Sequence, residues 1–232
     1  MTTRQSVKDA TAVRVQAGPV VLEGNLIVPE GARGIVLFAH GSGSSRFSPR
    51  NQAVARTLND SGLATLLIDL LTAEEAAIDR LTGHLRFDID LLAGRLTGAT
   101  DWLARPDVTA SLRIGYFGAS TGAAAALVAA VERPAAIGAI VSRGGRPDLA
   151  GHVLPRVVAP TLLIVGGDDL AVIEMNRTAY TELRCEKRLE IVPGATHLFE
   201  ERGALEQVAA LAAAWFIRHL EDVPMQPSGP RT

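Results

Sequence analysis

One serine near the middle of the chain stands in a setting that favours nucleophilic chemistry. Residues 118–122 read Gly-Ala-Ser-Thr-Gly, with a predicted strand at 112–117 before the serine and a predicted Ala-rich helix at 121–131 after it. A sharp strand-to-helix turn brings neighbouring backbone so close that only very small residues fit two positions before and after the serine. The motif therefore predicts that the Ser120 hydroxyl is raised above a sheet as a nucleophile.

A serine hydroxyl is a weak nucleophile unless a base removes its proton, and histidine is the usual base. Of the five histidines in the chain, His197 follows a predicted strand at 189–192 in the loop Pro-Gly-Ala-Thr-His. In a parallel sheet, that loop lies at the same edge as the turn that carries Ser120. We therefore predict that His197 is the general base.

The base needs a carboxylate that holds its ring in one tautomer and stabilises the imidazolium form. Asp168 and Asp169 both follow a predicted strand at 161–165. Either carboxylate is able to play this part, and the residues alone leave the choice open.

Acyl transfer also needs N–H donors for the negative charge that develops on the carbonyl oxygen. The backbone N–H of Thr121, directly after the nucleophile, is the first candidate. The second comes from the Gly/Ser loop at 40–45, which follows a predicted buried strand at 34–39. Ser42 is the preferred donor in this loop, with Gly43 as the alternative.

Arginine supplies 21 of the 23 basic residues, and some arginines follow strands at the predicted active edge. Arg46 lies just beyond the Gly/Ser loop, and Arg143 and Arg146 bracket two glycines after a predicted strand at 137–141. Guanidinium groups bind carboxylates and phosphates in a bidentate way, so these three arginines form a candidate site for an anionic group of the substrate. The alternative is that they pair with nearby acids such as Asp148.

The elements that must position these residues alternate regularly along the chain. Two leading segments, 13–17 and 21–28, predict an antiparallel hairpin at the edge of a sheet, with the turn at 18–19. Five alternations of strand and helix then predict an α/β fold with a mostly parallel sheet and helices on both faces. Between Asp69 and Phe87 the sequence predicts a polar loop, which leaves no room for a cap domain.

The composition excludes several other classes of protein. The chain has 232 residues, of which 47% are hydrophobic and 21% charged, and this predicts one globular domain over 1–222 with a disordered tail at 223–232. A net charge of −2 argues against nucleic acid or an anionic membrane as the partner. The single cysteine excludes an internal disulfide framework, and we expect neither a metal site nor a cofactor.

The uncharged stretch at 114–131 is long enough to suggest a membrane span, but three glycines interrupt it. We read it as a buried strand, a turn and a buried helix. The N-terminal residues are polar and lack the apolar core of a secretory signal, so a cytoplasmic location is expected.

Four segments together carry a family resemblance: HGSG from His40, GYFGASTG from Gly115, IVGGDD from Ile164 and PGATHLFEE from Pro193. The chain resembles the α/β-hydrolase superfamily, and within it the dienelactone-hydrolase-like group, over nearly its whole length. The order serine, aspartate, histidine is also that of α/β-hydrolases. The resemblance implies an eight-stranded sheet and a triad in which Asp169, rather than Asp168, is the acid. The namesake enzymes of the group carry cysteine at the position of Ser120, so this chain departs from them there.

The sequence thus predicts a serine hydrolase that cleaves a small carboxylic ester through Ser120, Asp169 and His197. A thioesterase or lactonase with the same three residues is the near alternative. A non-catalytic ligand-binding protein of the same fold is the alternative of another class. The expected partner is a small-molecule ester, and the expected state is a monomer or a small homo-oligomer.

Overall fold

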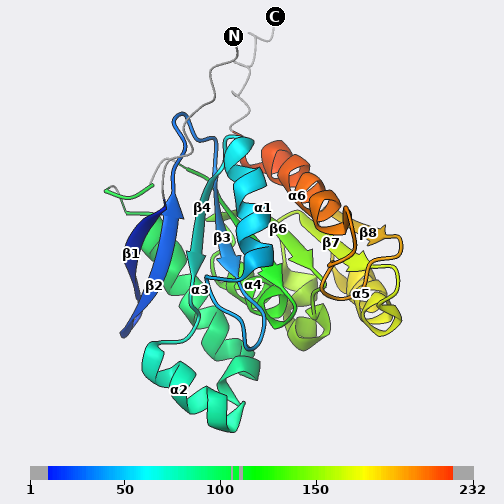
Figure 1. Cartoon of the computed structure of the whole chain (residues 1–232), viewed down its shortest axis with the longest axis horizontal. Helices are drawn as coiled ribbons and strands as arrows, with labels where there is room; N and C mark the ends of the chain where they lie inside the picture. Colours follow the sequence, from blue (N-terminus) through cyan, green and yellow to red (C-terminus); the bar gives the residue numbers. More distant parts are fainter. Residues whose placement is uncertain (1–9, 106, 110–111, 222–232) are drawn as a thin grey trace, which may run out of the picture.

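The eight strands of the computed structural model form one sheet in the order β1-β2-β4-β3-β5-β6-β7-β8 (Figure 1). The structure describes residues 10–105, 107–109 and 112–221, so the tail predicted at 223–232 lies outside the described residues. All neighbouring strands from β4 to β8 in this order are parallel, whereas β1–β2 and β2–β4 are antiparallel. This confirms the predicted α/β fold. The strands are β1 (Thr11–Ala17), β2 (Val20–Ile27), β3 (Ile35–Ala39), β4 (Ala64–Ile68), β5 (Ile114–Ala119), β6 (Ile137–Arg143), β7 (Thr161–Gly166) and β8 (Lys187–Val192).

The central strands β3, β4 and β5 are buried at every position because helices cover the sheet on both faces. In β1 and β2, by contrast, buried positions tend to alternate with exposed or partly buried ones, as expected of an antiparallel pair at a sheet edge. Gly18 turns the chain between them at φ +62°, a conformation that glycine adopts without strain. The predicted hairpin is therefore confirmed.

The helices form two layers. In Figure 1, α1 and α6 lie together on one face of the sheet, and α3 and α4 lie on the other. The residues of β3 alternate accordingly: Val36 and Phe38 pack with the α1–α6 layer, and Leu37 packs toward α3 and α4. The helices are α1 (Pro49–Asp60), α2 (Ala73–Thr82), α3 (Ile89–Leu103), α4 (Thr121–Glu132), α5 (Leu170–Glu182) and α6 (Ala204–Leu220), with 3₁₀ helices η1 (Leu85–Phe87) and η2 (Pro147–Arg156).

The segment between Asp69 and Phe87 is not the polar loop that the sequence predicts, since it contains α2 and η1. Of the ten residues of α2, all described, only Asp79 is buried, so the helix lacks the apolar stripe that periodicity detects. Its ends are instead stabilised locally. Thr72 and Glu75 form a reciprocal capping box at the start, and Gly83 ends the helix at φ +70°. The capping box is readable in the sequence as Thr-x-x-Glu.

The uncharged stretch at 114–131 divides at Ser120 into β5 and α4, as predicted. Within the described ranges, no helix is both long and apolar enough to cross a bilayer.

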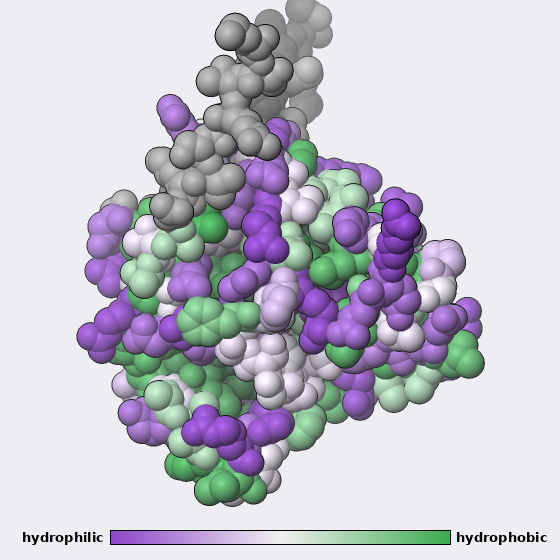
Figure 2. Space-filling view, viewed as in Figure 1, coloured by the Kyte–Doolittle hydropathy of each residue, from purple (hydrophilic) through white to green (hydrophobic). Residues whose placement is uncertain are grey.

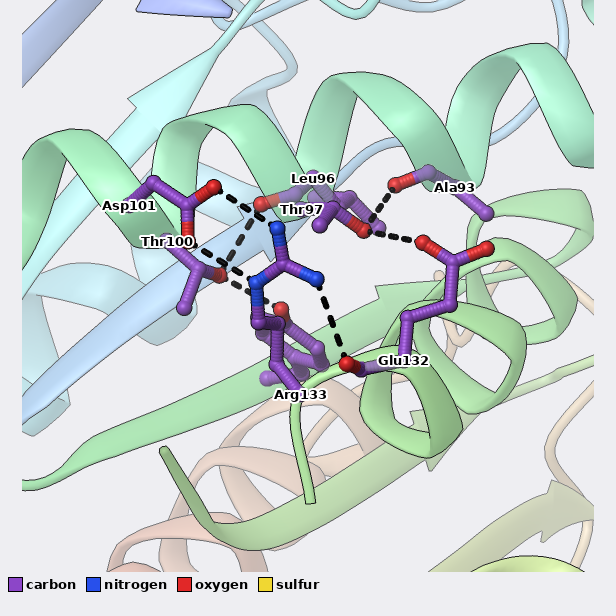
Figure 3. Close-up of polar contacts among 8 residues, drawn as sticks. Ala93, Leu96, Thr97, Thr100, Asp101, Glu132 and Arg133 are labelled. Atoms are coloured by element: carbon purple, nitrogen blue, oxygen red, sulfur yellow. Dashed lines mark hydrogen bonds and ion pairs between the residues drawn. The ribbon is translucent and has the colours of Figure 1, made fainter. Parts of the chain in front are cut away.

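Polar contacts tie the far end of α4 to α3 (Figure 3). Arg133, directly after α4, donates two 2.9 Å hydrogen bonds to the carboxylate of Asp101. Glu132 accepts a 2.8 Å hydrogen bond from the hydroxyl of Thr97. These contacts hold in place the helix whose other end begins at the candidate nucleophile.

Candidate active site

Ser120 occupies a strained turn between β5 and α4. Its backbone has φ +51° and ψ −120°, a region that residues with a side chain rarely adopt. The flanking glycines explain how the turn closes. A Cβ on Gly118 would lie 2.4 Å from Ala123 Cα, and a Cβ on Gly122 would lie 2.3 Å from the carbonyl oxygen of Ala39. Only glycine fits at these two positions, which confirms the steric reading of the motif.

The backbone of Ser120 is tied to the loop after β6. The Ser120 N–H donates to the carbonyl oxygen of Arg143 at 3.2 Å, and its own carbonyl oxygen accepts from the N–H groups of Ala123 and Arg146, both at 3.1 Å. The turn is thereby fixed by hydrogen bonds with both its own helix and the next loop of the sheet edge.

His197 and Asp169 meet at this edge from two different loops. The ring Nδ1 of His197 lies 2.7 Å from Oδ2 of Asp169. The loops are in backbone contact, since the Asp168 N–H donates to the Ala195 carbonyl at 3.0 Å. A Cβ on Gly166 would lie 2.3 Å from that same carbonyl oxygen, so glycine is required for the approach. Of the two candidate aspartates, the structure brings Asp169 to the histidine.

Gly144 links His197 to Ser120. It follows Arg143, whose carbonyl holds the Ser120 N–H, and a Cβ on Gly144 would lie 3.5 Å from His197 Cε1. Among the hydrogen bonds of the described residues, none joins Ser120 Oγ to His197. Such bonds are often long in ligand-free enzymes and tighten when substrate binds.

The loop at 40–45 approaches the serine closely. A Cβ on Gly41 would lie 3.1 Å from Ser120 Cβ, so a larger residue would push the loop away. The N–H of Ser44 closes a turn onto the Gly41 carbonyl at 3.1 Å, with Gly43 at φ +69°. Ser42, Gly43 and Thr121 all line one cavity. The Thr121 N–H belongs to the first turn of α4, where backbone donors have no partner within the helix.

His40 anchors this loop to the end of β4. Its Nε2 accepts the Leu70 N–H at 3.1 Å, so Nδ1 carries the proton and donates to the Gly41 carbonyl at 2.9 Å. Burial lowers the pKa of His40 below its ordinary value of 6.5, which favours this neutral form. His40 is therefore a structural residue of the loop, with both ring nitrogens occupied.

A cavity of about 750 Å³ lies beside the loop and reaches Thr121. Its walls come from residues 40–46, from residues 69–74 and from α2, and its far end is formed by Arg14, Val21 and Glu23. Neither Ser120 nor His197 lines the cavity, so it meets the candidate site on the side of the backbone N–H groups. In Figure 2, hydrophobic side chains emerge at the lower end of the molecule, where α2 lies and where Ile78 and Leu81 are exposed.

Three arginines of the cavity were not among the residues singled out from the sequence. Arg14 lies on β1, Arg80 on α2 and Arg86 on η1. Arg86 binds the buried carboxylate of Asp79 through Nε at 2.6 Å, and a Cβ on Gly43 would lie 3.3 Å from Arg86 Nη1. Recognising the Thr-x-x-Glu capping box would have predicted a helix after β4 and placed Arg80 on it.

The three arginines predicted as an anion site are not gathered in one place. Arg46 lines the cavity but forms an ion pair with Asp69. Arg146 binds Asp148 through two hydrogen bonds of 2.9 and 2.8 Å, which is the alternative reading of that residue. Arg143 is buried, and its Nη2 donates to Asn51 Oδ1 at 3.0 Å. Arg46 is therefore the one member of the predicted set that lines this cavity.

In the ranges that the structure covers, no group of three or more His, Cys, Asp or Glu side chains is arranged to hold a metal ion.

Comparison with known proteins places this geometry in a family. The sequence model of the dienelactone hydrolase family matches residues 22–221. A crystal structure described as a dienelactone hydrolase from Anabaena variabilis is 65% identical, covers 91% of this chain and 98% of its own, and superimposes with a TM-score of 0.90. The esterase Est1E from Butyrivibrio proteoclasticus is 17% identical over 89% of this chain and 98% of its own, with a TM-score of 0.74, and shares the fold.

Two curated proteins of Mycobacterium tuberculosis, from strains CDC 1551 and H37Rv, are each 61% identical over 208 residues. Both are provisionally named as phosphoribosyl transferases. The match covers 90% of this chain and 46% of each relative, so the chain spans about half the length of the curated relatives it matches.

Proposed function

The chain belongs to the dienelactone hydrolase family, and we propose that it is a serine hydrolase that cleaves a small carboxylic ester through an acyl-enzyme. The observation that carries the proposal is the 2.7 Å contact between His197 and Asp169, at the edge where the strained turn presents Ser120. Hydrolase chemistry is common to the family. The serine nucleophile and the ester substrate are the parts that we propose.

In the proposed reaction, Ser120 Oγ attacks the ester carbonyl carbon while its proton passes to His197 Nε2. Asp169 accepts a hydrogen bond from Nδ1–H, which leaves Nε2 unprotonated and free to act as the base. The N–H groups of Thr121 and Ser42 stabilise the oxyanion. Collapse of the tetrahedral intermediate breaks the bond to the alcohol, which takes the proton from His197. Water then attacks the acyl-enzyme while His197 takes its proton. The second tetrahedral intermediate collapses to release the acid, and Ser120 Oγ takes the proton from His197.

We further propose that the substrate carries an anionic group. The support for this is the cavity, which is of the size that holds a small ligand and has Arg14, Arg46, Arg80 and Arg86 in its walls. Arg46 and Arg86 are committed to Asp69 and Asp79, whereas no described residue forms an ion pair with Arg14 or Arg80. Arg14 lies on the edge strand β1, with three strands between it and β5, so we propose Arg80 as the guanidinium that pairs with a carboxylate on the acyl group.

A fluorophosphonate probe tests the nucleophile, because it labels only activated serines. We expect the wild-type protein to be labelled and Ser120→Ala to remain unlabelled. Ser61→Ala, at the end of α1, is the matched control and should label like the wild type. An unlabelled wild-type protein would favour the non-catalytic ligand-binding alternative.

Two esters of similar size test whether Arg80 recognises an anionic group on the substrate. They are 4-nitrophenyl butyrate and the singly charged 4-nitrophenyl succinate. Arg80→Met should raise KM for the succinate by about 10-fold or more and leave KM for the butyrate unchanged. Arg56→Met, on the exposed surface of α1, is the control. Equal effects of Arg80→Met on both esters would remove Arg80 from substrate recognition. Thioester and lactone substrates in the same panel separate the near alternatives.

A further inference from the structure

Arg143, the last residue of β6, is a buried cation that pairs with no acid in the described part of the chain. It is 6% exposed, and its Nε is a buried donor with no acceptor among the described residues. Within the same residues, no carboxylate forms an ion pair with it. Burial, and to a smaller extent the charge of Arg50, lowers the pKa of Arg143 to about 10. Burying a guanidinium with so few partners costs free energy of folding, which points to a function for the contacts that it does make.

Those contacts reach both halves of the candidate site. The Arg143 carbonyl oxygen accepts the N–H of Ser120 at 3.2 Å. Its guanidinium carbon lies 5.9 Å from the centre of the Phe199 ring, within the range of a cation–π interaction. Its Nη2 donates to Oδ1 of Asn51, a buried residue in the first turn of α1. Arg143 therefore contacts the nucleophile turn through its backbone, and the histidine loop and α1 through its side chain.

Phe199, whose ring receives the Arg143 guanidinium, belongs to the same loop as His197. It follows His197 by two residues, is 2% exposed and has φ +56°, in the left-handed region that disfavours residues with a side chain. Its N–H closes a turn onto the Thr196 carbonyl at 3.2 Å, and this turn contains His197. The ring packs against Gly144, where a Cβ would lie 3.4 Å from Phe199 Cε2. The strained backbone is held by the burial of the ring.

We propose that Arg143 is a positioning residue that, through the Phe199 ring and Asn51, orients the turn carrying His197 toward Ser120. The proposal rests on the proposed function, since it assigns His197 the part of base. It replaces the prediction that Arg143 binds an anion of the substrate. Arg143 acts on the chemical step through His197, so its loss should change kcat for every ester and leave substrate affinity alone.

The test compares Arg143→Met, Phe199→Leu and the double variant with wild-type protein on 4-nitrophenyl butyrate and 4-nitrophenyl succinate. We expect Arg143→Met to lower kcat by about 10- to 100-fold on both esters, with KM within about threefold of wild type, because small misplacements of reacting groups cost about this much. The rate of fluorophosphonate labelling should fall by the same factor. The fall in kcat of the double variant should be no larger than that of the worse single variant, because both substitutions remove the same contact between Arg143 and Phe199.

Thr100→Val is the control for general destabilisation, since it removes a buried hydrogen bond at the α3 side of the sheet. It should lower Tm and leave kcat unchanged. If Arg143→Met does not fold, Phe199→Leu and Asn51→Ser provide the same test, with a fall in kcat expected from each.

Three results would overturn the proposal: an unchanged kcat in folded Arg143→Met, a rise in KM for the succinate alone, or multiplicative losses in the double variant. The second result would instead support the prediction that Arg143 binds an anionic group of the substrate. A wild-type protein that is not labelled by the fluorophosphonate would instead overturn the proposed function. The two failures are therefore distinguishable.

Discussion

His197 Nδ1 and Asp169 Oδ2 lie 2.7 Å apart, although the two residues are 28 positions apart in the chain. The contact forms because the loops after β7 and β8 leave adjacent parallel strands at the same edge. Asp168, one residue earlier, instead ties these loops together through its backbone N–H. Neighbouring aspartates thus have different parts, which leads to the first prediction.

Asp169→Asn should lower kcat for ester hydrolysis by about 10³- to 10⁴-fold, because an amide does not hold the ring in the tautomer that leaves Nε2 free. Asp168→Asn, the matched control, keeps the backbone bond to Ala195 and should change kcat by less than about threefold. Steady-state kinetics on 4-nitrophenyl butyrate checks both. A comparable loss in the two variants would contradict the assignment of the acid.

Alanine at two glycines should change stability in opposite directions. Gly122→Ala places a Cβ 2.3 Å from a backbone oxygen of β3, so we expect a loss of about 3 kcal/mol or more in the free energy of unfolding. Gly94→Ala, in α3, meets no atom within 4 Å and should add about 0.5–1 kcal/mol through its better helix propensity. Urea denaturation followed by circular dichroism measures both. A stable Gly122→Ala variant would contradict the steric account of the turn.

The stability of the protein should fall in mild acid, partly because of His40. Its pKa is lowered in the folded state, so the unfolded chain binds more protons near and below pH 6.5. Where the unfolded state binds more protons, stability rises with pH. The contribution of neutral His40 is therefore complete above its ordinary pKa and is lost as the pH falls below that value.

Replacing His40 by Asn removes this titration and keeps a donor for the Gly41 carbonyl. The difference in the free energy of unfolding between about pH 5 and about pH 8 should be smaller in His40→Asn than in the wild type. His219, whose pKa is also lowered by burial, remains in both proteins and does not confuse the comparison. An unchanged difference would mean that His40 does not contribute to the pH dependence.

Two polar contacts of α3, one with β5 and one with the residue after α4, predict a ranking of two substitutions. Thr100→Val leaves the buried hydroxyl of Tyr116 without its 2.5 Å partner and should cost about 1–3 kcal/mol. Arg133→Met breaks the ion pair with Asp101. The side chains of Arg133 and Asp101 are 40% and 55% exposed, so the substitution should cost less than about 1 kcal/mol. Added salt should reduce the effect of Arg133→Met and leave that of Thr100→Val unchanged. The opposite ranking in urea denaturation would contradict this account.

Features encoded by short segments were predictable from the sequence. The glycines around Ser120 report a steric requirement within five residues, and the apolar runs of β3, β4 and β5 report burial on both faces. The order of strands and helices then determined which loops share an edge. Because these relations depend on neighbouring residues and on the rules of parallel sheets, the α/β fold with its mostly parallel sheet and the approximate place of the candidate site followed without coordinates.

The tertiary structure alone decided which side chains meet. The residues alone leave Asp168 and Asp169 open, and the contact between two loops brings Asp169 to His197. Arg46 pairs with Asp69, 23 residues away, because folding brings the two together, whereas the pairing of Arg146 with Asp148 was already open to the sequence. Arg143 reads from sequence as a loop cation, but its burial between Asn51 and Phe199 comes from elements 92 and about 56 residues away. Helix α2 escaped detection because capping and an ion pair, rather than an apolar face, hold it in place. Pattern reading detects burial and local sterics, whereas partner choice between charged groups is settled only by distances in space.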